Sequence, residues 1–242
     1  MTQKELDNMR RLMGEYLILS ESQENQRRLR CWELEVCARD QWHGRPRADG
    51  FRCQGLVPIT VDLQNTFWLQ LFPQDLAQCY QDPVAYLRFY LQKRVAAFRR
   101  LTDDTPLDRT VPIYLGAPFE SSLFGVPVHF FPDKDPIIDQ QAAVVVRSPG
   151  DLNRLEKVDF YKSGMMPLAH RLYEGVQEIA GDAFTVVFPE CIRGSFGAAL
   201  YARGYQHLLV DLVADPVFAD AVLESWDPAG EPLDLAIRLE CM

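Results

Sequence analysis

The residues that could do chemistry gather in the stretch FPECIRGSFGAALYARG, residues 188–204. An apolar run ends at Pro189, and an acid, a thiol and an arginine follow before a series of small residues begins. Glu190 could carry a proton or hold a polar group, and Arg193 could bind a carboxylate through two parallel hydrogen bonds. We therefore predict a pocket loop over 189–195, with Glu190 as the candidate catalytic residue and Glu190, Arg193 and Ser195 as candidate substrate-binding residues. The alternative is a surface loop in which the glutamate and the arginine are solvated or paired with each other.

The same stretch nearly contains a nucleophile elbow. Residues 193–197 read Arg-Gly-Ser-Phe-Gly, so Ser195 stands where G-x-S-x-G places its nucleophile, but an arginine replaces the first glycine. The histidine that follows, His207, belongs to the next expected helix, which disfavours an acyl hydrolase. Neither G-x-G-x-x-G nor G-K-[ST] occurs in the sequence, so no nucleotide-binding loop is predicted.

Two further regions could contribute to a site. Asp62 comes near the end of the apolar run 56–63 and is either a substrate-binding acid or the cap of a helix starting near Asn65, the cap being favoured. The segment 116–136 is dense in glycine, proline and aromatic residues and includes Glu120 and Asp133. It could form a pocket wall or lid, although an ordered loop and hairpin is more typical of such a composition.

Alternating strands and helices are expected to position these residues. Branched and aromatic residues predict strands at 56–63, 110–115, 126–131, 142–146 and 184–188. Helices are predicted over 4–43, over 162–180 and in most of 195–226, and three Asp-Pro or Ser-Pro pairs predict helix starts, at 82–83, 148–149 and 215–216. Strands separated by long helical connections favour an α/β fold with parallel strands, in which the loop after a strand faces the ligand.

Composition narrows the range of functions. The 242 residues carry 34 acidic and 25 basic side chains, and the resulting charge of −9 disfavours binding to nucleic acid or to an anionic membrane. No secretory leader or membrane span is predicted, and six scattered cysteines indicate a reduced, cytoplasmic protein. The four histidines lack zinc-ligand spacing, so no metal site is predicted within the chain.

Four segments together resemble the uroporphyrinogen decarboxylase superfamily. They are FPECIRGSFGAALYARGYQHLLVDLVADPVFADAVLE (188–224), SLFGVPVHFFPDKDPII (122–138), RSPGDLNRLEKVDFYKSGMMP (147–167) and TDDTPLDRTVPIYLG (102–116). The resemblance implies a TIM-type (β/α)8 barrel whose cleft lies at the carboxyl ends of the strands. It is nearest to the methyltransferases that move a methyl group between a corrinoid and a thiol, because the arginine-rich motif of the true decarboxylases has no counterpart here.

The resemblance also implies an incomplete barrel. A complete barrel needs about 250 residues, so we expect a helical N-terminal extension over 1–55 and a barrel over 56–242 without its C-terminal half. The family's His-x-Cys zinc motif is absent from this sequence.

The leading hypothesis is therefore methyl transfer involving a corrinoid carrier and a thiol acceptor, with a corrinoid protein as partner and zinc as the family's metal. A truncated or non-catalytic binding subunit is the alternative, as is cofactor-independent decarboxylation of a tetrapyrrole or aromatic acid. Exposed strand edges would favour self-association.

Overall fold

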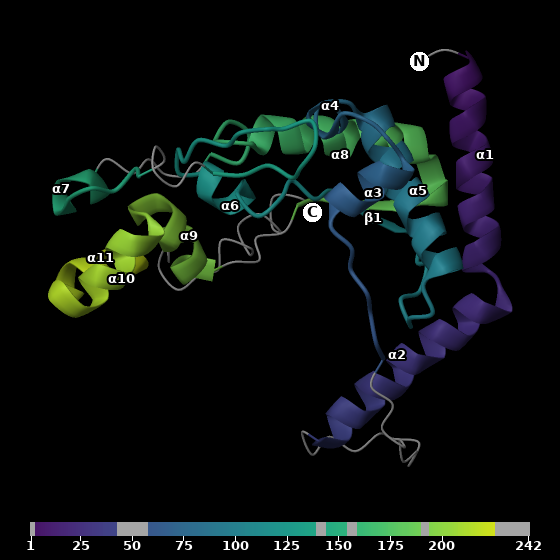
Figure 1. Cartoon of the computed structure of the whole chain (residues 1–242), viewed down its shortest axis with the longest axis horizontal. Helices are drawn as coiled ribbons and strands as arrows, with labels where there is room; N and C mark the ends of the chain where they lie inside the picture. Colours follow the sequence, from purple (N-terminus) through teal and green to yellow (C-terminus); the bar gives the residue numbers. More distant parts are fainter. Residues whose placement is uncertain (1–2, 43–57, 139–143, 154–158, 190–193, 226–242) are drawn as a thin grey trace.

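A mainly helical chain surrounds one small parallel sheet (Figure 1). The computed structural model describes residues 3–42, 58–138, 144–153, 159–189 and 194–225, and within 34–42 and 194–195 it describes the backbone alone. In these parts the elements are α1 Gln3–Ser20, α2 Gln23–Trp42, α3 Asn65–Leu71, α4 Leu76–Cys79, α5 Pro83–Arg100, β1 Thr110–Pro112, α6 Phe119–Ser122, α7 Pro149–Leu152, α8 Met166–Ala180, the 3₁₀ turn Gly181–Ala183, β2 Thr185–Val187, α9 Gly194–Arg203, α10 Tyr205–Ala214 and α11 Pro216–Glu224.

The two strands of the sheet are parallel, as the sequence predicted. Thr110 pairs with Thr185 and Pro112 with Val187, and α8 lies between the strands in the chain. Val111 is fully buried and Val186 is almost so, because α5 and α8 pack against each other beside the sheet. The parallel direction is thus confirmed, and a mainly helical structure with a small parallel sheet is consistent with the α/β class.

Tyrosine hydroxyl groups occupy the other edge of β1. Tyr90 donates a hydrogen bond of 2.9 Å to the carbonyl oxygen of Thr110, and Tyr86 donates one of 2.9 Å to that of Pro112. The Tyr86 hydroxyl also accepts a hydrogen bond from the backbone N–H of Tyr114. Side chains from α5 thus satisfy backbone groups that a further strand would otherwise satisfy.

The predicted strand at 56–63 is wrong for its described part. Residues 58–63 form no strand, and the N–H groups of Ile59 and Val61 donate to the carboxylates of Asp104 and Asp103. Side-chain acceptors here replace the backbone ladder that an apolar run suggests. Because the tyrosines already cover β1, this segment does not pair with it.

Two more predicted strands are also absent from the described residues. Segment 126–131 contributes a single antiparallel bridge, between His129 and Ile137. Of segment 142–146 the described residues are 144–146, and there the N–H groups of Val145 and Val146 both donate to the carbonyl oxygen of Ala202. Hydrogen-bond partners on a loop and on α9 therefore replace the partners that a neighbouring strand would provide. The described sheet has two strands and does not form a barrel.

The predicted helix starts are confirmed. The Asp82 carboxylate accepts a hydrogen bond from the N–H of Val84 at the start of α5, and that of Asp215 accepts one from Phe218 at the start of α11. At α7 the Ser148 N–H donates to the Asp151 carboxylate. Each side chain pairs a backbone group that helix geometry leaves without a partner.

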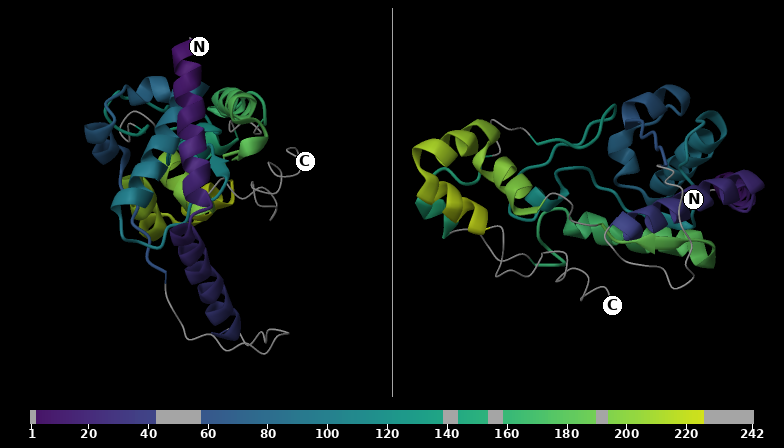
Figure 2. Two further views of the ribbon diagram at one scale, coloured as in Figure 1. Left: turned by 90° about the vertical axis from the view of Figure 1, so that its right-hand side faces the viewer. Right: turned by 90° about the horizontal axis from the view of Figure 1, so that it is seen from below.

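The buried residues form two clusters. The larger unites α1, α3–α6, α8 and both strands, and the smaller unites α9–α11 with Val126, Ile138 and Val146. Figures 1 and 2 show α9–α11 gathered at one end of an elongated molecule and α1 at the other. Phe124 and Val128 pack against both clusters, which joins the two regions.

Across the helices that the structure describes, none combines the length and the apolar character needed to cross a bilayer.

Candidate functional site

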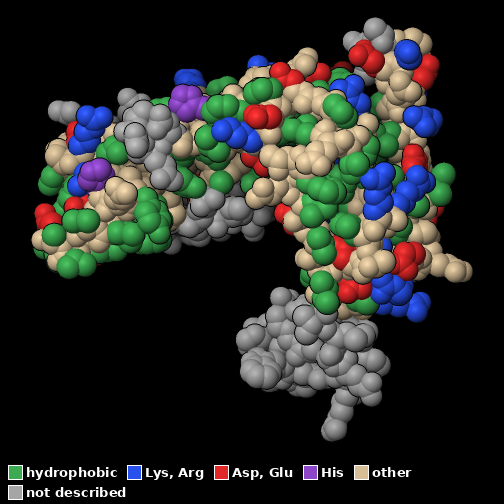
Figure 3. Space-filling view, in the orientation of Figure 1, with side chains coloured by type: hydrophobic (Ala, Val, Ile, Leu, Met, Phe, Trp, Pro, Cys, Tyr) green, Lys and Arg blue, Asp and Glu red, His purple; other side chains and the backbone are tan. Residues whose placement is uncertain are grey.

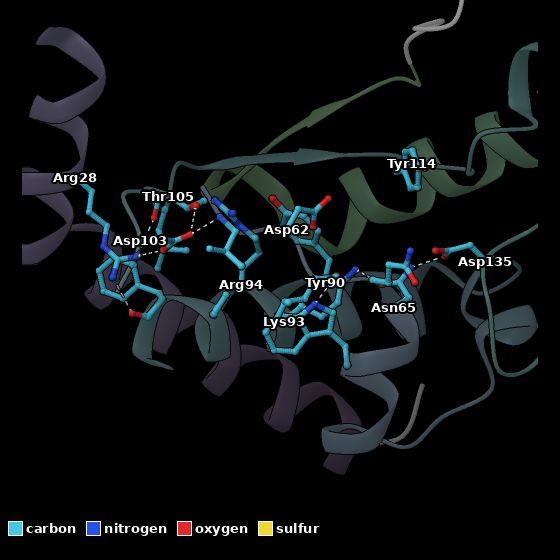
Figure 4. A pocket seen from close by; sticks show the side chains of 17 residues that line it. Arg28, Asp62, Asn65, Tyr90, Lys93, Arg94, Asp103, Thr105, Tyr114 and Asp135 are labelled. Atoms are coloured by element: carbon cyan, nitrogen blue, oxygen red, sulfur yellow. Dashed lines mark hydrogen bonds and ion pairs between the residues drawn. The ribbon is translucent and has the colours of Figure 1, made fainter. Parts of the chain in front are cut away.

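A cavity lies beside the tyrosine-covered edge of β1 (Figure 4). Its volume is about 620 Å³, within the range of pockets that hold small molecules. The lining side chains come from α5, from the loop before β1, and from the segment that enters α3. We call it the β1 cavity.

Helix α5 contributes the basic side chains of this cavity. Tyr90, Lys93 and Arg94 stand at positions i, i+3 and i+4, which share one face of a helix. The sequence analysis predicted the start of this helix and missed its basic pair. Two adjacent cations that follow a tyrosine by one helical turn were the available signal.

Arg94 has an incomplete set of hydrogen-bond partners. One terminal nitrogen donates to the carbonyl oxygen of Pro106, whereas the buried Nε has no partner among the described residues. No ion pair joins this guanidinium to a carboxylate within that part of the chain. A buried donor without a partner is costly, so a ligand acceptor would find a ready site here.

Lys93 lies at the start of a chain of hydrogen bonds. Its Nζ donates to Oδ1 of Asn65 at 2.6 Å, and Nδ2 of Asn65 donates to Oδ1 of Asp135 at 2.5 Å. The Tyr80 hydroxyl donates to the same carboxylate oxygen at 2.7 Å. Burial lowers the pKa of Lys93, and the charges of Asp135 and Asp62 act in the opposite direction.

Tyr90, which lines the cavity, and its neighbours Tyr86 and Tyr80 are neutral donors. Burial raises the pKa of Tyr90 well above its ordinary value, and it does the same for Tyr86 and Tyr80. Their hydroxyl groups therefore stay protonated at neutral pH and can hold backbone carbonyls or ligand oxygens.

Arg28 and Asp103 also line the cavity, but their partners explain them without a ligand. Arg28 is 3% exposed and donates to Glu24, Asp103 and three backbone carbonyls, and its guanidinium lies 4.2 Å from the Phe98 ring centre. Asp103 accepts from Arg28, from the N–H of Val61 and from Thr105. This pair fixes the wall of the cavity.

The structure places one of the predicted site residues in this cavity. Asp62 is exposed and lines it, whereas the N-terminal cap position of α3 belongs to Gln64, so the favoured helix-cap role of Asp62 is wrong. Glu190 and Arg193 lie outside the described residues. Ser195 lies in the first turn of α9, and its side chain is likewise not described.

A second cavity of about 450 Å³ lies at the carboxyl ends of the parallel strands. It is lined by Ile113, Tyr114 and Leu115 after β1 and by Phe188 and Pro189 after β2. Glu120, which is 5% exposed, and the loop 116–119 complete the wall, so part of the glycine-rich segment is a pocket wall. Tyr114 lines both cavities. The loop entered at Pro189 therefore begins at a cavity.

A metal site is not evident in the described part of the chain. No three or more histidine, cysteine, aspartate or glutamate side chains there lie close enough together to bind an ion. The described residues therefore do not fit a zinc ion.

Comparison with known proteins gives one structural likeness. No family model and no curated protein matches this chain. A solved structure described as a methyltransferase from Methanosarcina mazei is similar with a TM-score of 0.46 and 11% identity, over 79% of this chain and 51% of that chain. This chain thus spans about half of that protein's length.

Proposed function

We propose that the protein binds a small organic anion in the β1 cavity, with Arg94 as the group that holds its carboxylate. The observation that carries this proposal is the buried Nε of Arg94, which lacks a partner among the described residues while its side chain lines a cavity of about 620 Å³. A carboxylate in the cavity would accept charge-assisted hydrogen bonds from the guanidinium, whose hydrogen-bonding capacity is not fully used.

The charges around the cavity are consistent with a monoanion. Arg28 and Asp103 form an ion pair at 3.2 Å and cancel each other. Asp135 lies opposite Lys93 across the Asn65 amide. Asp62 remains as an acid near the opening, where solvent screens its charge. Burial opposes the charge of Arg94, but Tyr90, Tyr16 and Asp108 favour it and its pKa is raised, so the guanidinium stays positively charged.

Calorimetric titration with a matched pair of ligands tests the proposal. Benzoate and benzamide have almost the same shape, and we expect benzoate to bind at least about 10-fold more tightly because it alone offers a charged acceptor. Arg94→Met should remove this preference, whereas Arg100→Met, an exposed position at the end of the same helix, should retain it. Equal binding of the two ligands to the unaltered protein would overturn the proposal.

Methyl transfer at the strand ends is a second candidate. The specific observation in its favour is the cavity of about 450 Å³ where the carboxyl ends of two parallel strands meet, which is where α/β proteins bind ligands. On this proposal the loop with Glu190, Arg193 and Ser195 contacts the substrate, and the two strands belong to a TIM-type barrel. A methyl group would pass between a corrinoid and a thiol.

The cofactors of this second candidate would come from outside the described residues. A corrinoid ring is larger than the ligands that pockets of this size usually enclose, so it would contact the mouth of the cavity on a separate corrinoid protein. Zinc would require ligands that the described residues do not provide. A truncated binding subunit, or a decarboxylase of a tetrapyrrole or aromatic acid, would use the same cavity without these groups.

Spectroscopy tests methyl transfer directly. Protein mixed with methylcobalamin and a thiol, with and without zinc, should change the corrinoid absorption spectrum under anaerobic conditions. Heat-denatured protein is the control. An unchanged spectrum in every mixture would contradict methyl transfer, and it would leave the anion-binding proposal to be decided by its own titration.

A further inference from the structure

We propose that Lys93 is a covalent binding site for carbonyl compounds, and that an oxo acid is the class of ligand that the β1 cavity takes. The carboxylate of the oxo acid would be held by Arg94, a role that rests on the proposed function, while the carbonyl carbon would react with Nζ of Lys93. Both side chains line the same cavity from neighbouring positions of α5 (Figure 4).

The environment of Lys93 differs from that of an ordinary surface lysine. The side chain is partly buried, its Nζ lies 4.7 Å from the centre of the Phe89 ring, and no ion pair joins it to a carboxylate among the described residues. Lys93 also lines a third cavity, of about 130 Å³, whose walls include Cys79, Tyr80, Tyr86 and Phe89. The amine therefore has space for a ligand and little water to stabilise a positive charge.

The partner of Nζ is a neutral amide whose orientation is fixed. The Asp135 carboxylate can only accept, so the Asn65 amide must direct its nitrogen to Asp135 and its oxygen to Lys93. An amide oxygen accepts a hydrogen bond from a neutral amine as well as from an ammonium group. A carboxylate in that place would have favoured the charged form far more strongly. Asn65 thus holds the amine in position without an adjacent full negative charge.

The charged groups around Lys93 determine how readily it loses its proton. Asp135, Asp62 and the Cys79 thiol favour the charged amine, while burial and the Arg94 cation oppose it. Burial is the largest of these effects, and it lowers the pKa of Lys93. Burial also raises the pKa of Cys79 to about 11, which keeps that thiol uncharged at neutral pH. A lysine in such a setting is a typical nucleophile toward carbonyl groups.

The covalent step is an ordinary condensation. The lone pair of Nζ forms a C–N bond with the carbonyl carbon, and the carbonyl oxygen takes up two protons, in net terms both from the neutral amine. It leaves as water, and a C=N bond remains. No oxidant or reductant takes part, and the linkage is reversible until a hydride reagent reduces it.

Reductive trapping on the full chain tests the proposal. Protein at pH 7 is incubated with glyoxylate or with 4-oxopentanoate, oxo acids of different length, or with neutral propanal, each in the presence of cyanoborohydride. Peptide mass spectrometry then gives the labelled fraction of every lysine. We expect at least one oxo acid to label Lys93 at least about 10-fold more than exposed Lys162. The reason is that the neutral fraction of an amine increases about 10-fold for each unit by which its pKa falls.

The comparisons between reagents separate this inference from the function on which it rests. Arg94→Met should abolish the preference for oxo acids over propanal at Lys93, and propanal labelling should fall but persist, because the Arg94 cation also lowers the pKa of Lys93. Lys93→Met should lose the label, and Lys162→Met should keep it. The proposal is overturned if none of the three reagents labels Lys93 more than Lys162, even where benzoate binding confirms the anion site. Because the main readout uses the unaltered protein, it does not depend on how the variants fold.

Discussion

The region around β1 and β2 and the helical region of α9–α11 bury their side chains in different ways. The first encloses aromatic residues and leucines, with Leu87, Leu91 and Leu172 fully buried. The second has a core of small residues, in which Ala199, Ala202 and Ala219 are fully buried. Small residues let helices approach closely, but each removes less apolar surface from water. The second region therefore has less hydrophobic stabilisation of its own.

Their surfaces differ as well. Helix α10 buries only Leu208 among its described residues, while Val210 is 61% exposed, Val213 86%, and Val217 at the start of α11 78%. Figure 3 shows hydrophobic side chains at the end of the molecule where these helices lie. Most apolar residues of α5, by contrast, are buried. Clustered exposed apolar side chains are typical of contact surfaces, which makes self-association at α10 an expectation. Four sets of variants test whether the two regions differ in this way.

The largest expected effect concerns two ion-paired arginines, buried Arg28 in the first region and partly buried Arg203 in the second. Arg28→Met would leave Asp103, 4% exposed, without its cation, and we expect the free energy of unfolding to fall by about 3–5 kcal/mol. Arg203→Met leaves Asp211, whose side chain is 13% exposed, without its cation, and we expect the free energy of unfolding to fall by about 3 kcal/mol or less. Chemical denaturation followed by circular dichroism measures both. A larger loss for Arg203→Met would reverse the ranking of the two regions.

The second prediction uses truncations of matched leucines. Leu172→Ala in α8 and Leu208→Ala in α10 each remove a fully buried side chain, at a cost of about 2–5 kcal/mol, with Leu172 the more costly. Hydrogen exchange should locate the protection lost by Leu208→Ala in α9–α11. If that variant lowers protection equally in α5 and α8, the regions unfold as one unit and the distinction fails.

The third prediction is a pH effect confined to the first region. Hydrogen bonds from Arg27 and Arg28 lower the pKa of Glu24 from 4.5 to about 2. A carboxyl with a lowered pKa stabilises the fold above its unfolded pKa, and this contribution is lost as the pH falls from about 4.5 toward about 2. Denaturation midpoints at pH 6, 4 and 3 should therefore fall more steeply for the unaltered protein than for Glu24→Gln. Parallel curves would contradict the prediction.

The smallest effect on stability is expected at the exposed face of α10. Val213→Lys should change the free energy of unfolding by no more than about 0.5 kcal/mol, because the side chain contacts little. The same change should reduce self-association in sedimentation velocity, and Val217→Lys should act alike. Lys162→Glu, on a distant exposed turn, is the control. An unchanged sedimentation coefficient for the double valine variant would contradict a contact surface here.

Local signals in the sequence predicted much of the helical structure. Proline after Asp82, Ser148 and Asp215 marked three helix starts correctly, because a cap depends on residues that are neighbours in the chain. The parallel direction of the strands agrees with the expectation for strands joined by long helical connections, although the pairing of β1 with β2 was not predicted. The expectation of a cavity after the second strand agrees with the position of Pro189. The roles of Glu190, Arg193 and Ser195, and the domain boundaries at 55 and 56, remain predictions.

The missing strands and the β1 cavity depended on contacts between residues far apart in the chain. The run 56–63 has the composition of a strand, yet Asp103 and Asp104 supply acceptors to its backbone, and tyrosines of α5 cover the strand edge that it would need. The sequence alone indicated where helices begin, because a cap depends on neighbouring residues, and it favoured parallel strands, because long helical connections separate the apolar runs. Only the tertiary structure decided that Lys93 and Arg94 line a cavity, because the walls of that cavity come from segments that folding alone brings together.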